Sequence, residues 1–242
     1  MKTNYNIIVL LLFSFCIFGQ NELSPEQVLE DYTIFKEIIT TGHPSLYEYT
    51  SKAQWDSIFY DFEQTRIKDL TESKELFKAI NSIAKNAYDG HLVIYHPKMD
   101  TVPALFPLLL KIIDGKLYTD TDDFGIPLGA EITSIEGIKS NIIIQEFLKY
   151  AASDGYNPNK KYRQIEKEFG ILYYYEYGEK ESFIVKYSIN NSELRTIEIV
   201  PESFESLENR YPKRSSHFAM YHGNTDRVEH FKNTLAEKWP FV

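Results

Sequence analysis

Apolar residues recur at helical spacing in the first third of the chain, in three segments separated by turn-forming residues. The first segment begins at Ser24-Pro25-Glu26-Gln27, which combines an N-cap hydroxyl, proline at the first helical position and glutamine three residues past the cap. The second begins with the same capping pattern at Ser51-Lys52-Ala53-Gln54, and the third opens at Thr71. These patterns predict three packed helices within residues 24–88.

Beyond Asp89 the pattern changes to short β-type runs mixed with two helical segments. The clearest signal is the dipeptide Asp114-Gly115 between two apolar runs, which predicts a hairpin. The predicted strands are 92–95, the apolar stretch 105–113 interrupted by Pro107, 116–119, 129–137 with a turn at Glu136-Gly137, 183–187, and 194–200 after a turn at Asn190-Asn191. The predicted helices begin at Ser140 and at Pro158, the second ending at about Phe169 before the run Tyr173-Tyr174-Tyr175.

The first twenty residues are typical of a secretory signal peptide. Lys2 precedes an apolar run from Ile7 to Phe18, and small or polar residues follow it. The run is shorter than the roughly 20 residues that a membrane-spanning helix needs, so export to the periplasm or beyond the cell is favoured over a stable membrane span. Cys16, the only cysteine, lies inside this run, so the mature chain would contain no disulfide, and its neighbours fit a lipid-anchor signal poorly.

Composition and charge exclude some classes of partner. With 43% hydrophobic and 25% charged residues, the chain has the composition of an ordinary globular protein. The 26 basic and 35 acidic residues give a net charge of −9, and the basic residues are scattered, so binding of nucleic acid is not expected. The histidines have no cysteine or paired carboxylate at ligand spacing, so neither a metal site nor another cofactor is predicted.

Three stretches resemble the tail-specific, or C-terminal processing, serine peptidases: His43–Tyr47, Tyr88–His91 and Pro127–Gly137. The resemblance covers residues of about 25–200. In that family a helical cap precedes a PDZ-like domain that captures a substrate C-terminus, and a crotonase-like domain with the catalytic serine follows. The resemblance therefore implies an α+β fold, with a three-helix N-terminal cap followed by a PDZ-like mixed α/β module. The expected divisions are a signal peptide at 1–20, the cap at 21–90, the PDZ-like domain at 91–200 and an incomplete C-terminal segment at 201–242.

His91 is the candidate catalytic residue, because in the tricorn-like branch of this family the matching histidine is the general base for the serine. An imidazole titrates near neutral pH and can pass a proton from a serine to a leaving amine. A turn histidine following Gly90 is an equally weighted alternative. Asp89 could orient His91, although a turn-capping aspartate is favoured, and His43 is assigned a structural role beside a helix end.

The catalytic serine of the family has no counterpart here, because it lies in a small-residue strand-to-helix segment downstream of the PDZ-like domain. The serines after residue 200 are Ser203, Ser206, Ser215 and Ser216, and none lies between an apolar strand and an amphipathic helix. We therefore expect the front part of a secreted peptidase of this type, inactive alone. The alternatives are a secreted adaptor without enzymatic activity and a site whose serine comes from another chain.

A peptide-binding role is implied for Gly129, Glu131, Ile132 and Gly137, which would shape the PDZ-like strand and turn. Such modules add a peptide strand to a sheet edge and hold its terminal carboxylate with backbone amides. The implied partners are polypeptide C-termini. An ordinary β-hairpin in a mixed domain is an equally weighted alternative.

Overall fold

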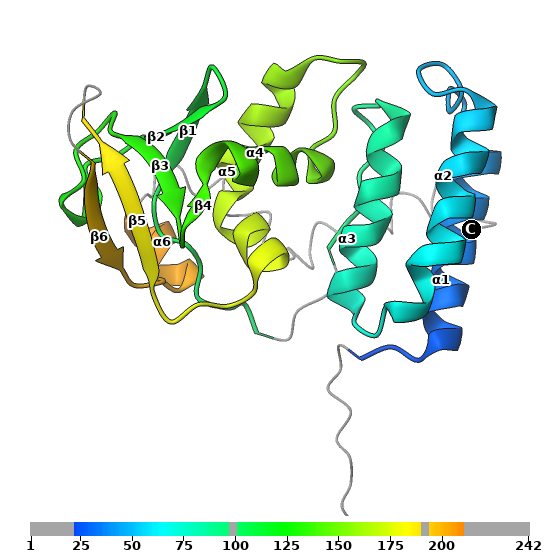
Figure 1. Cartoon of the computed structure of the whole chain (residues 1–242), viewed down its shortest axis with the longest axis horizontal. Helices are drawn as coiled ribbons and strands as arrows, with labels where there is room; N and C mark the ends of the chain where they lie inside the picture. Colours follow the sequence, from blue (N-terminus) through cyan, green and yellow to red (C-terminus); the bar gives the residue numbers. More distant parts are fainter. Residues whose placement is uncertain (1–21, 97–100, 190–193, 211–242) are drawn as a thin grey trace, which may run out of the picture.

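The computed structural model describes residues 22–96, 101–189 and 194–210. The signal peptide expected at 1–20, the turn expected at Asn190-Asn191 and the segment 211–242 lie outside these residues. The described chain forms helices at one end and an antiparallel sheet with covering helices at the other, which confirms the α+β class (Figure 1). None of the described helices is both long and apolar enough to cross a bilayer.

The N-terminal helices begin where the capping patterns predict, except for the third. The hydroxyls of Ser24 and Ser51 each accept a hydrogen bond from the backbone N–H three residues on. The side-chain oxygens of Gln27 and Gln54 in turn accept the backbone N–H of the capping serine. The third helix has Glu72 as its N-cap and so begins later than Thr71. The helices are α1 (Pro25–Glu37), which continues into a π-helical turn (Ile38–Gly42), α2 (Lys52–Thr65) and α3 (Ser73–Ala84), which ends in a 3-10 turn (Lys85–Ala87).

A small aromatic core holds these helices together and fixes the loop that follows α1. Trp55 of α2 is 1% exposed and stacks on Phe59, with ring centroids 5.4 Å apart. Its indole N–H donates to the carbonyl of Leu46 at 2.9 Å. The loop after α1, which carries His43, is therefore tied to the centre of the helical unit.

Every strand pairing in the sheet is antiparallel. The strands are β1 (Leu110–Ile113), β2 (Lys116–Thr119), β3 (Glu131–Ile135), β4 (Ile138–Lys139), β5 (Phe183–Ser188) and β6 (Arg195–Ile199). Their order is β1-β2-β3-β5-β6, with β4 paired to β3. The two hairpin turns predicted from sequence, at Asp114-Gly115 and Glu136-Gly137, have positive φ at both residues, the backbone that a tight two-residue β-turn requires.

Three secondary-structure predictions were wrong. Residues 92–95 form no strand, because no described strand lies beside them to pair with. Of the stretch 105–113, only the last four residues join the sheet as β1, although Leu105 makes an isolated bridge to Glu202. The helix α5 (Pro158–Tyr177) continues past Phe169 and includes the tyrosine run, because burial of those rings outweighs their β propensity.

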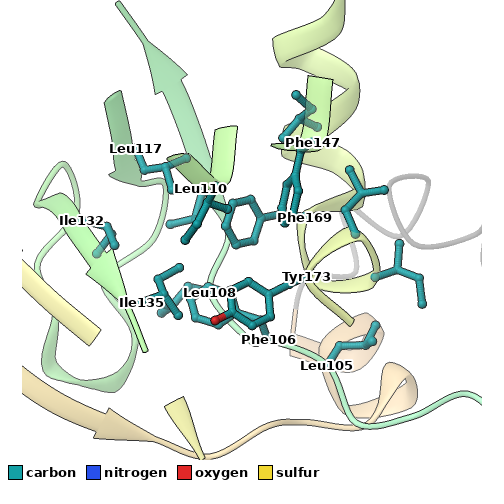
Figure 2. Close-up of a cluster of buried hydrophobic side chains, with 14 of the residues drawn as sticks. Leu105, Phe106, Leu108, Leu110, Leu117, Ile132, Ile135, Phe147, Phe169 and Tyr173 are labelled. Atoms are coloured by element: carbon teal, nitrogen blue, oxygen red, sulfur yellow. The ribbon is translucent and has the colours of Figure 1, made fainter. Parts of the chain in front are cut away.

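The main core lies between one face of the sheet and the helices α4 (Ser140–Phe147) and α5 (Figure 2). Phe169 and Tyr173 of α5 face the apolar side chains of the strands, and Phe106 packs against both Phe169 and Phe183 at 5.4 and 5.0 Å between ring centroids. Phe204 and Leu207 of the short helix α6 (Phe204–Arg210) are buried in the same core. The beginning of the C-terminal segment 201–242, which was predicted to be incomplete, therefore packs onto the sheet and its helices.

The helical unit and the sheet unit share this core through α3. Phe77 of α3 stacks on Tyr150 with ring centroids 5.6 Å apart and lies 4.9 Å from Tyr175 of α5. Lys78 adds a bond to the carbonyl of Glu176 at 3.4 Å. Figure 1 shows α3 as the helix of the N-terminal unit that faces α4 and α5. The boundary expected at residue 90 is thus bridged by packed side chains.

The outer edge of β1 is closed by two charged residues of α5. Glu166, with a side chain 5% exposed, accepts the Ile112 N–H at 2.6 Å, and Arg163 donates to the Ile112 carbonyl at 2.7 Å. Glu166 also pairs with Arg163 at 2.7 Å and with Lys111 at 3.3 Å. Because the backbone groups of Ile112 are satisfied by side chains, this position offers no open edge to a further strand.

Glu166→Ala is expected to destabilise the fold by about 2 kcal/mol. It leaves the buried Ile112 N–H without an acceptor and removes the carboxylate that pairs with Arg163. Urea unfolding monitored by tryptophan fluorescence measures this change. Glu146→Ala is the matched control, since Glu146 is 48% exposed and its partner Lys149 keeps a closer pairing with Glu176 at 2.7 Å. A change above about 0.5 kcal/mol is not expected for it. Equal effects of the two variants would contradict this role of Glu166.

Burial of Glu168 predicts a second, pH-dependent effect on stability. Burial raises the pKa of this carboxyl from 4.5 to about 7, against weaker opposing effects of Gln164 and Lys167. A raised folded-state pKa means that the stabilisation is complete below pH 4.5 and is lost as pH rises through 7, by up to about 3 kcal/mol. Glu168→Gln should remove this slope. The measurement is the difference in unfolding free energy between the two proteins from pH 5 to 8, and a constant difference would contradict the assignment.

Candidate functional site around His91

Three loops meet at the candidate site, which lies where the helical unit contacts the sheet unit. The hydroxyl of Thr50 donates to the carbonyl of Asn86 at 2.6 Å, which joins the loop after α1 to the end of α3. The N–H of Gly155 donates to the carbonyl of Tyr88 at 2.8 Å, which joins the loop before α5 to the same segment. Tyr88 itself has left-handed backbone, with φ 50° and ψ 36°. A non-glycine residue in this conformation is held by its surroundings, and such residues are common at functional sites.

Asp89 is the centre of the site. Its Oδ1 accepts the backbone N–H of His91 at 2.6 Å and lies 3.3 Å from Nδ1 of the same residue. Its Oδ2 lies 3.2 Å from Nε2 of His43. Asp89 is therefore both the turn-capping residue favoured from sequence and a direct partner of His91. It also bridges two imidazoles that are 48 residues apart in sequence (91 − 43 = 48).

The hydrogen bonds assign a tautomer to each histidine. Nδ1 of His43 accepts the N–H of Ser45 at 3.3 Å, so its proton is on Nε2 and is donated to Asp89. His91 presents Nδ1 to Asp89, which places the proton there and leaves the lone pair of Nε2 free. The two side chains differ in exposure, at 8% for His43 and 90% for His91. His43 thus supports Asp89 from inside, whereas Nε2 of His91 is open to solvent.

The electrostatics keep Asp89 ionised. The backbone N–H of His91 holds the pKa of Asp89 below its usual value, with help from the nearby imidazole of His43, and burial opposes this shift. An ionised carboxylate beside Nδ1 is a strong hydrogen-bond acceptor for a proton on that nitrogen of His91. The pair therefore has the arrangement of a general base with its orienting carboxylate.

Gly90 allows the loop before α5 to approach closely. Its N–H donates to Oδ1 of Asp154 at 2.8 Å, and Lys160 donates to its carbonyl at 3.3 Å. A Cβ at this position would lie 2.4 Å from Nζ of Lys160 and 2.8 Å from Oδ1 of Asp154. A side chain at position 90 would therefore displace the ends of Lys160 and Asp154, and Asp154 Oδ1 now lies 3.9 Å from Nδ1 of His91.

Asp89, His91 and Asp154 are the described residues that could together hold a metal ion, since one ligand atom of each lies within 4.8 Å of the others. The fit is poor. Each carboxylate already accepts a backbone N–H through Oδ1, and the ammonium group of Lys160 bonds to the intervening residue. The arrangement therefore favours acid–base chemistry over metal chemistry at His91.

No hydroxyl or thiol among the residues described here hydrogen-bonds to His91. Of the serines considered from sequence, Ser203 accepts the N–H of Ser206 at 3.1 Å and Ser206 donates to Glu202 at 3.0 Å, as in a helix N-terminus. Ser215 and Ser216 lie outside the described residues. The site contains a base and an orienting group, and a nucleophile is not paired with them in the described part of the chain.

The residues predicted to bind peptide lie in and beside β3. Gly129 and Gly137 both have positive φ, so each shapes a turn. Glu131 and Ile132 pair with β2 on one side and β5 on the other, so β3 is an interior strand. An added peptide strand needs a free edge, which these residues do not provide. Contact of their side chains with a peptide remains a prediction.

Sequence reasoning singled out His91 and Asp89 but missed the residues that complete the site. His43 was assigned only a structural role, and Asp154 was not considered. The signal available for Asp154 was weak, namely an Asp-Gly pair in a polar loop before a helix. Because these residues reach His91 through tertiary contacts, no local spacing could have connected them.

Comparison with known protein families and with curated proteins finds no match to this sequence. Among solved structures, a similar chain comes from a "Structure of mature CPAF complexed with lactacystin", at 12% sequence identity and a TM-score of 0.49. The match covers 73% of the present chain and 34% of that chain. The present chain thus spans about a third of the length of the structure it matches.

The two histidines should respond differently to truncation. His43→Ala is expected to lower the unfolding free energy by about 2 kcal/mol, because it removes a buried partner of both Asp89 and Ser45. His91→Ala should change stability by less than about 0.5 kcal/mol, since its side chain is 90% exposed. Urea unfolding at pH 7 measures both. A large loss of stability in His91→Ala would assign that residue a structural role.

Proposed function

We propose that this chain carries the general base of a tail-specific serine peptidase-like protein, with His91 as that base. The observation that supports the proposal most strongly is the chain of contacts from buried His43 through Asp89 to exposed His91. It presents a free Nε2 lone pair to solvent in the tautomer that proton abstraction needs. The sequence resemblance around Asp89-Gly90-His91 adds the reaction class, which is peptide-bond hydrolysis.

In this proposal the proton moves from a serine hydroxyl to Nε2 of His91 as the hydroxyl oxygen attacks the scissile carbonyl. The imidazolium then returns the proton to the leaving amine as the peptide bond breaks, and a water molecule completes hydrolysis by the same route. Asp89 is the positioning residue throughout. The serine would be supplied either by polypeptide outside the described residues or by another chain, so the part described here is inactive alone.

A secreted peptide-binding adaptor is the second candidate. It is favoured by the finding that no hydroxyl within the described ranges pairs with His91. It also agrees with the topology, in which β6 is the terminal strand of the sheet and pairs only with β5 among the strands described. In both candidates the partners are polypeptide C-termini. We propose for both that residues 1–20 direct export.

Hydrolysis of p-nitrophenyl acetate tests whether Nε2 of His91 is accessible and carries a free lone pair. An exposed imidazole attacks this ester as a nucleophile and releases p-nitrophenolate, and water then cleaves the acyl-imidazole to regenerate the ring. We expect His91→Ala to remove most of the histidine-dependent rate and Asp89→Asn to reduce it several-fold. Asp56→Asn, which alters a 62% exposed carboxylate on α2, is the control and should leave the rate unchanged. A rate that is insensitive to both His91 and Asp89 would contradict the proposed base.

A second assay tests whether the full-length chain contains a nucleophile that works with His91. The purified full-length chain is incubated with an unfolded protein that has a free apolar C-terminus, and cleavage is followed by mass spectrometry. Binding without cleavage is the expected result for the chain alone. Cleavage that disappears in His91→Ala would show that the nucleophile is present, whereas cleavage that persists in this variant would overturn the role of His91.

A further inference from the structure

A hollow beside Asp89 is lined by three lysines, two of which form no ion pair with a residue of the described ranges. It has a free volume of about 20 Å³, opens to solvent and lies between the end of α3, the segment after Tyr88 and the start of α5. A volume of this size holds one water-sized group. The polar lining residues that matter here are Lys85, Asp89, Lys149, Ser153 and Lys161.

One of the three lysines is neutralised and two are not. Lys149 pairs with Glu176 at 2.7 Å and with Glu146 at 3.5 Å. Lys85 and Lys161 form no ion pair with any residue in the described ranges. The pKa of Lys161, which is half-buried, is lowered by burial and by the charge of Lys85. Lys85 is exposed, so an anion bound at the hollow would chiefly stabilise the charged form of half-buried Lys161.

The remaining walls suit an anion attached to an apolar group. Leu92, Ile94 and Ala151 line the hollow beside the lysines. Asp89, the acid on the wall, directs its two oxygens to His43 and His91. Each oxygen of a carboxylate can accept a charge-assisted bond from an ammonium group, and both Lys85 and Lys161 line the hollow.

An aromatic rim borders the hollow. The ring of Tyr88 lies 4.7 Å from that of Tyr156 and 6.0 Å from that of Tyr49, measured between centroids, and Nζ of Lys161 lies 5.9 Å from the Tyr88 ring. Tyr156 is 72% exposed and Tyr49 is 41% exposed. Exposed aromatic side chains beside a charged hollow are typical of surfaces that bind peptides.

We propose that Lys85 and Lys161 bind a carboxylate group of a peptide, with the aromatic rim of Tyr49, Tyr88 and Tyr156 holding the adjoining residues. The carboxylate belongs either to the chain end or to an acidic side chain. The proposal depends on the proposed function only in taking a polypeptide as the molecule that carries the carboxylate. The site is separate from β3, and it places a bound carboxylate next to the segment that carries His91.

Fluorescence anisotropy with three labelled peptides of the same apolar sequence tests the site. One ends in a free carboxyl group, one is amidated, and one is amidated with an internal glutamate. At least one of the two carboxylate-bearing peptides should bind about tenfold more tightly than the plain amide, because one charge-assisted contact is worth about a factor of ten in affinity. Its binding should weaken as salt rises from 50 to 200 mM, because salt screens the attraction between the charges. The peptide that binds identifies which carboxylate is recognised.

Lys161→Met should lose this preference, Lys161→Arg should retain most of it, and Lys68→Met is the matched control because Lys68 is exposed and lies outside the hollow. Retained binding by Lys161→Arg separates loss of charge from failure to fold. Equal binding of all three peptides, or wild-type preference in Lys161→Met, would overturn the proposal. His91→Ala should keep the preference, so failure of the anion site and failure of the proposed base give different results.

Discussion

Burial of one face of α5 against the sheet is the contact on which the rest of the structure depends. Phe169 and Tyr173 fill the space beneath the strands, and the same helix reaches α3 through Tyr175. Because the helix is rigid and 20 residues long, this packing also fixes the positions of polar residues elsewhere on it. Its first turns bring Lys160 and Lys161 to the loop that carries His91, and its middle closes the edge of β1.

Asp89 connects the interior of the helical unit to solvent. One oxygen of Asp89 contacts the buried imidazole of His43, and the other contacts the exposed imidazole of His91. The same carboxylate therefore joins a buried residue to the proposed base. The backbone N–H of His91 bonds to the same carboxylate, which closes a tight turn between Asp89 and His91.

The distribution of paired and unpaired polar groups separates structural positions from candidate binding positions. At β1 the carboxylate and guanidinium of α5 are fully used in closing a strand edge. At the hollow beside Asp89, by contrast, half-buried Lys161 and exposed Lys85 form no ion pair with a residue of the described chain. The polar groups at the edge of β1 have partners, whereas the lysines at the hollow have no ion pair, and this contrast supports the hollow as the proposed ligand site.

Local sequence by itself determined the caps of α1 and α2, the two hairpin turns and the starts of α4 and α5. These features depend on hydrogen bonds and backbone conformations within a few residues, so Ser51-Gln54 or Asp114-Gly115 suffices to specify them. The sequence also identified His91 and Asp89 as chemically interesting. Tertiary structure alone decided that Tyr173 to Tyr175 belong to a helix, that residues 92–95 are not a strand, and that β3 is interior. It also decided that His43 and Asp154 meet at Asp89 and His91. His43 and Asp89 are 46 positions apart (89 − 43) and are brought together by packing within the helical unit. Asp154 and His91 are 63 positions apart (154 − 91) and meet where the helical unit contacts the loop before α5.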